Sequence, residues 1–419
     1  MRQPAKLAQP EKSPETEFRT IHHLRFTNHG NPMRILHVVP SYLPAWRYGG
    51  PIRSVHGLCR GLAALGHDVH VFTTNVDGPG DSAVPLGVPV ETDGVKVWYF
   101  PSTRLRRLYW SPRMARALAA HLQEFDLVHL HSIFLWPTWA AARSARRAGV
   151  PYVVAPRGML VRELIGKKSR LAKNVWIRLI ERRNLEQAAG IHVTSRIEAE
   201  EAARFGFNLP PVHIVPNGVD MEDFDVPDRA LNDALPEIAA GGRYLVFLSR
   251  INWKKGLDRL IPALARVPGI SLVIAGNDEE NYLPVLEELA CRHGVRERII
   301  FSGAIDGKDK ATLLRNAAAL VLPSYSENFG IVVLEAMAAG CPVAVTPDVG
   351  LAGTVLECGA GVVVEGEPAK LGEALKRMLS DPQALSRMGE IGRRVVAEQF
   401  TWEAVAKRME KVYTGIIHV

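Results

Sequence analysis

The sequence predicts an α/β protein built from two doubly wound parallel-sheet domains that face each other across a cleft. The chain has 419 residues, which is longer than one hydrophobic core usually serves. From Met33 onward, short β-branched runs alternate with longer helical stretches, and this is typical of parallel strands joined by crossover helices. The alternation stops over residues 217–242, which are rich in Asp, Pro and Gly, and then restarts. Two similar domains are therefore expected.

The predicted domain organisation follows this pattern. Residues 1–32 mix Pro, Glu, Lys and Asn without an apolar run, so we expect a mobile tail and no secretory signal. Residues 33–216 form the first domain, 217–242 the linker and 243–400 the second domain. The last helix, residues 401–419, is a candidate to pack back on the first domain.

The expected strands are short apolar runs at regular intervals. In the first domain they are MRILHVV, DVHVFTT, VKVWYF, DLVHLHS, PYVVAP, GIHVTS and VHIVP. In the second domain they are YLVFLS, SLVIAG, RIIFSG, ALVLPS, PVAVT and GVVVEG. Ligands of such sheets bind beyond the carboxyl ends of the strands, so the active site is expected between the domains.

Charge and composition indicate what the protein can bind and in which compartment it acts. The net charge is +7 and the sequence pI is 9.2, with a basic excess concentrated in residues 157–183. This stretch reads either as a solvated helix face packed on a core or as a surface for anionic lipid or a phosphorylated acceptor. No segment reaches the roughly 18 apolar residues that a membrane-spanning helix needs. Four cysteines without metal-type or paired spacing favour a reducing compartment.

Residues 324–340, SYSENFGIVVLEAMAAG, give the clearest indication of a functional site. We expect a loop after a buried strand, with Glu327 at the cleft edge, followed by a helix from Phe329. The amides of Phe329, Gly330 and Ile331 would then be unpaired first-turn donors, which is a natural cradle for a phosphate. The sequence therefore predicts an anion site at this helix.

Glu335 follows in the same helix, within an apolar run where an unpaired carboxylate costs several kcal/mol. Glu327 and Glu335 could hold the two ends of a nucleotide diphosphate sugar by accepting hydrogen bonds from vicinal hydroxyls, with the diphosphate between them. The alternative is that Glu327 only ends a loop and that Glu335 pairs with a buried Arg or Lys. Both interpretations remain open from the sequence.

Basic and glycine residues complete the candidate site. In FLSRINWKKG, Arg250 follows the first strand of the second domain and Lys255 precedes a helix. Two cations there could neutralise a diphosphate leaving group without a metal ion. In the first domain, Gly50 opens a helix after the first strand, and it marks either an anion site or only a tight turn. His131 ends a strand and is either a packed core residue or part of the site.

Taken together, these motifs resemble those of the retaining glycosyltransferases of the GT-B fold, family 4. The resemblance covers residues 33–417, through the Gly-Gly loop, the His-bearing strand, VPNGVD, SRINWKKG, LPSYSENFG and the two glutamates eight positions apart. It implies two Rossmann-like domains. This sequence has Ser249 and Asn328 where the family commonly has Gly or another small residue, which leaves the identity of the sugar open.

The resemblance also implies roles for these residues. Glu327 would contact the transferred sugar, Glu335 the ribose, and Arg250 with Lys255 the diphosphate. His131 would lie beside the reacting sugar. Ala304 and Ile305 would contact the nucleobase through their backbone groups. The implied reaction moves a hexose from a nucleotide diphosphate sugar to a hydroxyl group with retention, without metal or cofactor. The departing phosphate would draw the proton from the incoming hydroxyl.

Several features of the reaction are expected from the same reasoning. The acceptor would be a sugar or a lipid-linked precursor bound by the first domain near His131 and Arg157. The protein would act in the cytoplasm in cell-surface polysaccharide, lipopolysaccharide or glycolipid synthesis, with peripheral contact to the inner membrane face through residues 157–183. Nucleic acid is not an expected partner. The alternatives are a nucleotide-sugar 2-epimerase on the same fold and a catalytically silent nucleotide-sugar-binding protein.

Overall fold

The structure is a computed structural model that describes residues 32–46, 49–160, 176–225, 231, 235–240 and 242–418. The predicted N-terminal tail lies outside the described residues. So does the middle of the basic stretch, residues 161–175.

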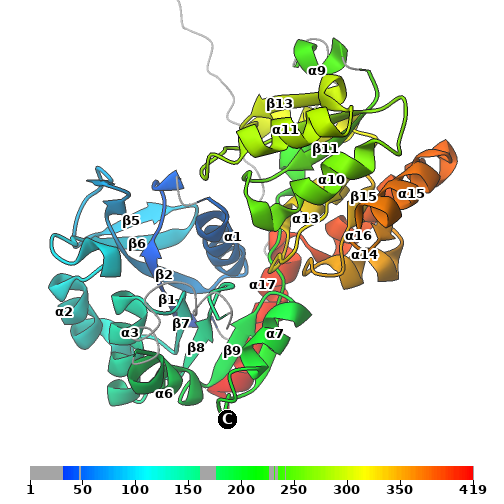
Figure 1. The fold of residues 1–419 in the computed structure, drawn as a ribbon. Coiled ribbons are helices and arrows are strands. Elements are labelled where there is room, and N and C mark those ends of the chain that lie inside the picture. The colour runs from blue at the N-terminus through cyan, green and yellow to red at the C-terminus, as the bar shows by residue number, and fades with distance from the viewer. Residues whose placement is uncertain are drawn as a thin grey trace, which may run out of the picture. The chain divides into compact units, whose positions relative to one another are not determined.

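The first sheet is mostly parallel and has the strand order β10-β9-β8-β7-β1-β2-β6-β5, with only β5 antiparallel to its neighbour (Figure 1). Its strands are β1 (Arg34–Ser41), β2 (Asp68–Thr74), β5 (Pro89–Thr92), β6 (Val95–Phe100), β7 (Leu127–His131), β8 (Tyr152–Ala155), β9 (Gly190–Val193) and β10 (Val212–Ile214). A two-stranded ribbon, β3 (Val76–Asp77) and β4 (Gly80–Asp81), follows β2.

Helices cover both faces of the first sheet. They are α1 (Gly50–Ala64), α2 (Pro112–His121), α3 (Trp136–Ala148), α6 (Arg182–Glu186) and α7 (Arg196–Ala203), with short turns η2 (Arg106–Leu108), η3 (Leu122–Glu124) and η4 (Ile177–Glu181). The C-terminal helix α17 (Trp402–Ile417) belongs to the same core, because Trp402, Met409 and Tyr413 are buried with side chains of α1 and β1. The last helix of the chain therefore contributes to the first sheet, not to the second.

The second sheet is wholly parallel, with the order β13-β12-β11-β14-β15-β16. Its strands are β11 (Tyr244–Leu248), β12 (Ser271–Ala275), β13 (Ile299–Gly303), β14 (Ala319–Leu322), β15 (Val343–Val345) and β16 (Gly361–Val363). Its helices are α9 (Pro236–Ala240), α10 (Leu257–Leu264), α11 (Leu283–Arg292), α12 (Gly307–Asn316), α13 (Ile331–Ala338), α14 (Ala352–Cys358), α15 (Pro368–Leu379) and α16 (Pro382–Gln399), with turns η5 (Met221–Phe224), η6 (Trp253–Lys255) and η7 (Arg296–Arg298).

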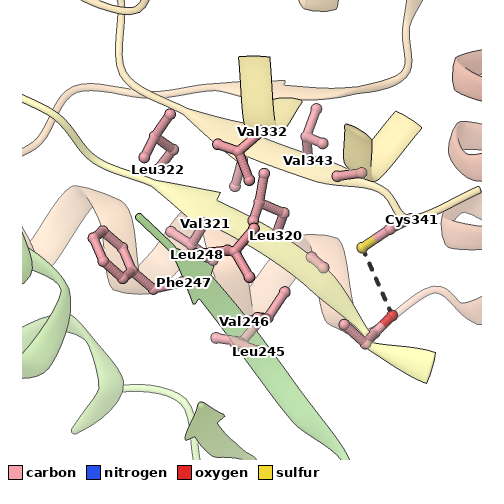
Figure 2. Close-up of a cluster of buried hydrophobic side chains, with 14 of the residues drawn as sticks. Leu245, Val246, Phe247, Leu248, Leu320, Val321, Leu322, Val332, Cys341 and Val343 are labelled. Atoms are coloured by element: carbon pink, nitrogen blue, oxygen red, sulfur yellow. Dashed lines mark hydrogen bonds between the residues drawn. The ribbon is translucent and has the colours of Figure 1, made fainter. Parts of the chain in front are cut away.

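The central strands of the second sheet read as unbroken apolar runs because both of their faces are covered. All five residues of β11 and all four of β14 are buried. Figure 2 shows residues 245–248 of β11 and 320–322 of β14 packed with Val332 of α13 and with Cys341 and Val343 of the following segment. This core fixes where β11 and β14 end, and therefore where the loops that carry Lys255 and Glu327 begin.

The sequence-predicted strands agree with the observed ones to within a few residues at each end. The ribbon β3–β4 and the edge strand β5 were not predicted. They are two to four residues long and mostly not buried, so they carry no continuous apolar pattern. The predicted linker, residues 217–242, also contributes two buried side chains to the core of the second sheet, those of Phe224 and Ile238.

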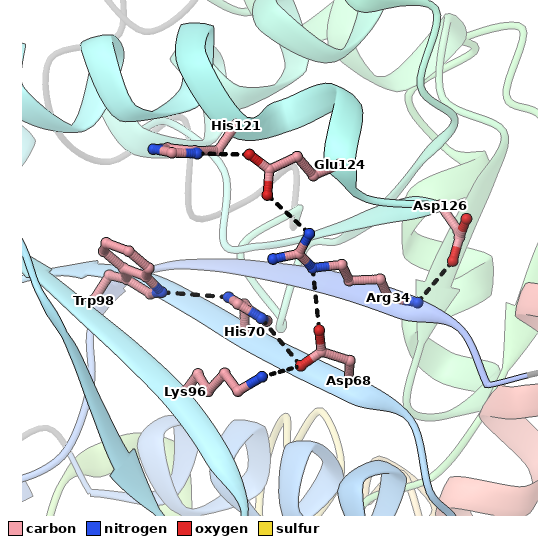
Figure 3. A network of polar contacts seen from close by, with 8 residues as sticks. All are labelled: Arg34, Asp68, His70, Lys96, Trp98, His121, Glu124 and Asp126. Atoms are coloured by element: carbon pink, nitrogen blue, oxygen red, sulfur yellow. Dashed lines mark hydrogen bonds and ion pairs between the residues drawn. The ribbon is translucent and has the colours of Figure 1, made fainter.

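A charged network lies at the amino ends of the first sheet's strands (Figure 3). Arg34 Nε lies 3.1 Å from Asp68 Oδ2, and its Nη1 lies 2.8 Å from Glu124 Oε2. Asp68 also accepts from Lys96 Nζ at 2.8 Å. Trp98 donates to His70 Nδ1, so the other ring nitrogen of His70 carries the proton that it donates to Asp68. The side chains of Arg34, Asp68, Lys96 and Glu124 are 37–45% exposed, so their ion pairs stabilise the fold only weakly, whereas His70 is buried.

Within the described residues, every helix is too short or too polar to cross a bilayer.

Candidate functional site

Lys255 and Glu327 form an ion pair beyond the carboxyl ends of β11 and β14. Lys255 Nζ contacts Glu327 Oε2, and the two side chains are 16% and 19% exposed. The two residues lie 72 positions apart in the chain and meet because β11 and β14 are neighbours in the sheet. The structure therefore brings together one predicted cation and one predicted carboxylate.

Gly256 explains how the loop of Lys255 approaches the loop of Glu327 so closely. Its φ is +73°, and a Cβ atom at this position would lie 2.0 Å from the carbonyl oxygen of Pro323. Only glycine fits such a position, since it has no Cβ and adopts positive φ without strain. The contact is reinforced by the amide of Tyr325, which donates to Lys254 O at 2.8 Å.

The backbone of Glu327 is held from a third side. Its amide donates to Asp348 O at 3.0 Å, and its carbonyl accepts from the amide of Gly350 at 2.9 Å. Both contacts come from the segment after β15. The loops that follow three neighbouring strands of the sheet, β11, β14 and β15, therefore position this one residue. These contacts fix the backbone of Glu327, while its carboxylate is held by Lys255.

The helix after Glu327 begins two residues later than the sequence suggested. Gly330 is the N-cap with φ +86°, and the first helical residue is Ile331. Phe329 is buried in the core of the second sheet. Within the described chain, the amides of Gly330, Ile331 and Val332 have no hydrogen-bond acceptor, and the first capping bond is from Val333 N to Gly330 O. Among the described residues the amide of Phe329 has no acceptor either, so the three predicted donors stay free and the amide of Val332 joins them.

Glu335 also forms an ion pair. Its Oε1 lies 2.7 Å from Nζ of Lys310, a residue of α12, and the two side chains are 15% and 12% exposed. This is the arrangement named above as the alternative for Glu335, a pairing with a buried lysine. The pair lies about one helical turn beyond the free amides at the start of α13.

The remaining predicted donor-site residues are more dispersed. Arg250 is exposed, and its Nη1 lies 3.1 Å from Glu279 Oε2 instead of sharing a partner with Lys255. Ala304 is exposed and Ile305 is half-buried, both directly after β13. Gly50 is exposed at the first position of α1, with nothing within 4 Å of a Cβ built on it.

His131, the last residue of β7, lies in a cluster of buried histidines that extends back to His37 and His129 in the middle of β1 and β7. Its Nε2 is 2.9 Å from His37 Nδ1, and its Nδ1 accepts from Arg157 Nη2 at 3.1 Å. His129 Nε2 lies 3.3 Å from His192 Nδ1, and His129 Nδ1 lies 2.6 Å from the hydroxyl of Tyr413. All four imidazoles are almost fully buried.

The partners fix the tautomers in this cluster. Arg157 only donates, so His131 Nδ1 is an acceptor and His131 Nε2–H donates to His37. The carbonyl of Val215 only accepts, so His192 Nε2 carries a proton and His192 Nδ1 accepts from His129. Tyr413 then donates to His129 Nδ1. The chain from Tyr413 through His129 and His192 ends at the carbonyl of Val215. The chain from Arg157 through His131 ends at His37, whose Nε2 is buried without a partner among the described residues.

Burial keeps the cluster neutral. It lowers the pKa of His37 and of His192 to about 3, and the positive charge of Arg157 acts in the same direction. The pKa values of His129 and His131 are also lowered well below the ordinary value, chiefly by burial. His131 is therefore a neutral, fully hydrogen-bonded side chain that reaches a ligand only through the residues around it.

The same cluster brings one ring nitrogen each of His37, His129 and His131 within 4.8 Å of one another. A metal ion needs a free lone pair from each ligand. In all three rings the unprotonated nitrogen already accepts a hydrogen bond, from His131, Tyr413 and Arg157 respectively. The guanidinium of Arg157 would also repel a cation, so the arrangement suits a hydrogen-bonded array better than a metal centre.

Sequence reasoning did not predict three sets of contacts in this region. Lys310 was not named, although an apolar helix that carries Glu335 calls for a nearby cation. Arg157 donates to His131 and Asn217, and its φ of +55° has no sequence signal. Asn328 donates to Thr194 Oγ1 at 3.1 Å, and its carbonyl accepts from Ser195 Oγ at 2.7 Å. Such contacts depend on tertiary structure that spacing alone does not predict.

Comparison with known proteins identifies the family. Residues 49–218 match the family described as "Glycosyl transferase 4-like domain", and residues 229–395 match "Glycosyl transferases group 1". The D-inositol 3-phosphate glycosyltransferase of Xylanimonas cellulosilytica is 30% identical, over 87% of this chain and 91% of that protein. Sucrose-phosphate synthase from Thermosynechococcus elongatus superposes with a TM-score of 0.71 at 24% identity, over 92% of this chain and 99% of that one. Anabaena HepE in complex with UDP-glucose gives a TM-score of 0.70 at 18% identity, over 91% and 100%. The chain belongs to the family 4-like glycosyltransferases of the GT-B fold.

Proposed function

We propose that this glycosyltransferase moves a hexose from a nucleotide diphosphate sugar to a hydroxyl acceptor, with retention and without a metal ion. The observation that carries the proposal is the placement of Lys255 and Glu327 beside the free amides of Gly330, Ile331 and Val332. This edge offers cationic and amide donors for a diphosphate and a carboxylate for sugar hydroxyls. The complex of HepE with UDP-glucose supports the donor class, since HepE shares this fold.

Different residues of the second lobe bind different parts of the nucleotide sugar. In the proposed complex, the amides and Lys255 bind the diphosphate, and Arg250 leaves Glu279 to join them. Glu327 then accepts hydrogen bonds from the transferred sugar, because its cationic partner has moved to the phosphate. Glu335 binds the ribose. Ala304 and Ile305 meet the base, while Gly50 of the first sheet approaches the donor from the other lobe.

The proposed chemistry proceeds on one face of the sugar. The bond between the anomeric carbon and the diphosphate oxygen breaks while the acceptor oxygen bonds to the same carbon on the same side. The departing phosphate oxygen takes the acceptor's proton, so no separate base is needed. Lys255, Arg250 and the helix amides stabilise the negative charge that develops on the leaving group. In metal-dependent enzymes a bound metal ion stabilises such a charge.

The acceptor is proposed to bind the first lobe near Arg157 and His131. The proposed acceptors are sugars or lipid-linked precursors in cell-surface polysaccharide, lipopolysaccharide or glycolipid synthesis, handled in the cytoplasm with peripheral membrane contact through residues 157–183. Most of that stretch lies outside the described residues. In the described part, Trp176 Nε1 donates to the buried carboxylate of Glu181 at 2.9 Å, so this tryptophan is engaged in packing. A small soluble acceptor remains the alternative, and the name of the Xylanimonas relative gives an example.

A thermal-shift panel of UDP-, GDP- and ADP-sugars tests the proposal. A ligand that binds the folded state at about 100 times its Kd stabilises it by about 2.7 kcal/mol, so one nucleotide series should raise the melting temperature clearly. The absence of any shift at millimolar concentrations would contradict a donor site. The anomeric configuration of the product, read by NMR, then tests retention. Epimerisation at C2 without an acceptor would instead indicate the 2-epimerase.

A further inference from the structure

The loop that joins β6 to α2, residues 101–111, exposes two large apolar side chains. Leu105 is 64% exposed and Leu108 is 37% exposed. The turn η2 holds their backbones together, because Leu108 N donates to Leu105 O at 2.8 Å. Tyr109 and Trp110 follow and are half-buried. A single exposed leucine needs no explanation, but apolar side chains gathered on one short loop indicate a contact surface.

The backbone of this loop is unfavourable and yet anchored. Leu105 and Tyr109 flank η2 with φ of +49° and +57°, a conformation that costs free energy in residues other than glycine. Arg106, between them, donates to Asp81 Oδ1 at 2.6 Å and so ties the turn to the ribbon β3–β4. The side chains of Leu105 and Leu108 belong to neither hydrophobic cluster of the first sheet. Strain that persists in an exposed, anchored loop points to a function for that loop.

The surroundings of the two leucines are basic. Residues 94–123 contain no Asp or Glu. Of the arginines in this stretch, Arg106 is the one with an ion pair among the described residues. The others are exposed and have no ion-pair partner in the part of the chain that the structure describes, namely Arg104, Arg107, Arg113 and Arg116. The exposed apolar side chains are therefore accompanied by positive charge that the protein itself does not neutralise.

The loop lies at the functional edge of the first sheet. β6 is parallel to β2, β1 and β7, so all four strands end at the same edge, and the loop follows the carboxyl end of β6 (Figure 1). His131 ends β7, which is three strands away from β6 in the sheet. At the usual spacing of parallel strands this is about 14 Å. An acceptor anchored in a bilayer at the loop would thus need to reach only this far to the proposed acceptor site.

We propose that residues 104–116, the docking surface, bind the face of a bilayer that carries anionic lipid headgroups. Leu105 and Leu108 enter the boundary between headgroups and acyl chains, while the unpaired arginines contact lipid phosphates. The inference rests on the membrane contact of the proposed function and assigns it to a surface other than residues 157–183, where Trp176 is engaged with buried Glu181.

Co-sedimentation of the full-length protein with lipid vesicles tests the proposal. Vesicles of equimolar phosphatidylglycerol and phosphatidylcholine should bind the protein, and vesicles of phosphatidylcholine alone should not. Added salt should weaken the binding without abolishing it, because it screens the arginines and not the apolar contact. No binding to the anionic vesicles, or equal binding to both kinds, would overturn the inference. Nucleotide titration without vesicles tests the donor site separately, so failure of the docking surface is distinguishable from failure of the proposed function.

Two double variants then locate the contact. Leu105→Ser with Leu108→Ser removes the apolar part, and Arg104→Gln with Arg107→Gln removes two of the charges. Each should weaken binding to the anionic vesicles by about 10–30-fold, and neither should change nucleotide affinity. Wild-type vesicle binding in either folded variant would overturn the inference and would place the contact elsewhere, for example in residues 157–183.

Arg387→Gln with Arg394→Gln is the matched control. Both residues are exposed on α16, so this variant loses the same charge at a distant part of the chain. It should bind the anionic vesicles as the wild type does. A loss equal to that of the Arg104 and Arg107 variant would show general attraction by net charge, and it would overturn the docking surface. Circular dichroism checks that every variant is folded.

Discussion

The carboxyl edges of the two sheets are built from opposite chemistry. At the second sheet, Lys255–Glu327 and Lys310–Glu335 are ion pairs of half-buried side chains with spare hydrogen-bonding capacity. At the first sheet, the imidazoles of His37, His129, His131 and His192 are buried, neutral and linked into fixed chains. In the proposed complex the second edge exchanges its internal partners for a charged ligand. At the first edge the imidazoles stay neutral, and the charge in contact with them is that of Arg157.

The largest effect is expected from Glu327→Gln. The amide keeps the shape of the side chain but loses the charge that we place against the transferred sugar, so sugar transfer should fall by about 10²–10³-fold. Nucleotide affinity should change little, since the phosphate contacts remain. Glu365→Gln is the control, because Glu365 forms an exposed pair with Lys370 in the same lobe. Transfer at the wild-type rate in Glu327→Gln would show that the carboxylate is not needed.

Lys255→Met should weaken nucleotide diphosphate binding by about 10–100-fold, because a charge-assisted contact to phosphate is lost. The affinity for the nucleoside without phosphates should stay unchanged, and titration calorimetry measures both. Lys370→Met, at the exposed pair, serves as the control. If the Lys255 variant loses nucleoside affinity to the same extent, its effect comes from altered structure and not from phosphate binding.

Acid should destabilise the fold through the histidines of the first sheet. Their lowered pKa keeps them neutral in the folded state, whereas the unfolded chain takes up protons below the ordinary pKa of about 6.5. The unfolded state then binds more protons, so stability is complete above pH 6.5 and falls toward pH 3, by up to about 1.4 kcal/mol per pH unit and histidine. The pKa is lowered in the same direction for His56, His67, His70 and His213.

Urea unfolding between pH 7.5 and 5.5 measures this effect, because carboxylates of ordinary pKa stay ionised in that range. Burial raises the pKa of Glu181 and of Asp220, and uptake of protons by these two groups in the folded state offsets part of the loss. A free energy of unfolding that is constant or that rises toward pH 5.5 would contradict neutral burial of the cluster.

The smallest effect is expected at the amino edge of the first sheet. Asp68→Asn removes the shared carboxylate of the network in Figure 3, in which the partners Arg34 and Lys96 are partly exposed and His70 is buried. The free energy of unfolding should fall by less than about 1 kcal/mol, and transfer should be unchanged. A loss of sugar transfer in this variant would contradict the assignment of function to the carboxyl ends of the strands, because it would mean that the amino ends affect the reaction.

Much of the fold was predictable because buried parallel strands leave unbroken apolar runs, as β11 and β14 do. The neighbourhood of Glu327 and Lys255 was also predictable, since parallel strands end at a common edge. The partner of Glu335 was not, because Lys310 comes from a helix 25 positions away whose spacing carries no sign of the contact. Likewise, nothing in the sequence distinguishes His131 as a solvent-free member of a hydrogen-bonded array from a histidine that faces a ligand.

Amide hydrogen exchange with saturating UDP, GDP or ADP tests the central claim most directly, because it locates the nucleotide without any substitution. The nucleotide that binds should slow exchange in residues 327–335 and 250–256, at the edge of the second sheet. Residues 127–131 of the buried histidine strand should exchange at the same rate with and without it. Slowed exchange at residues 127–131 with none at 327–335 would contradict the account.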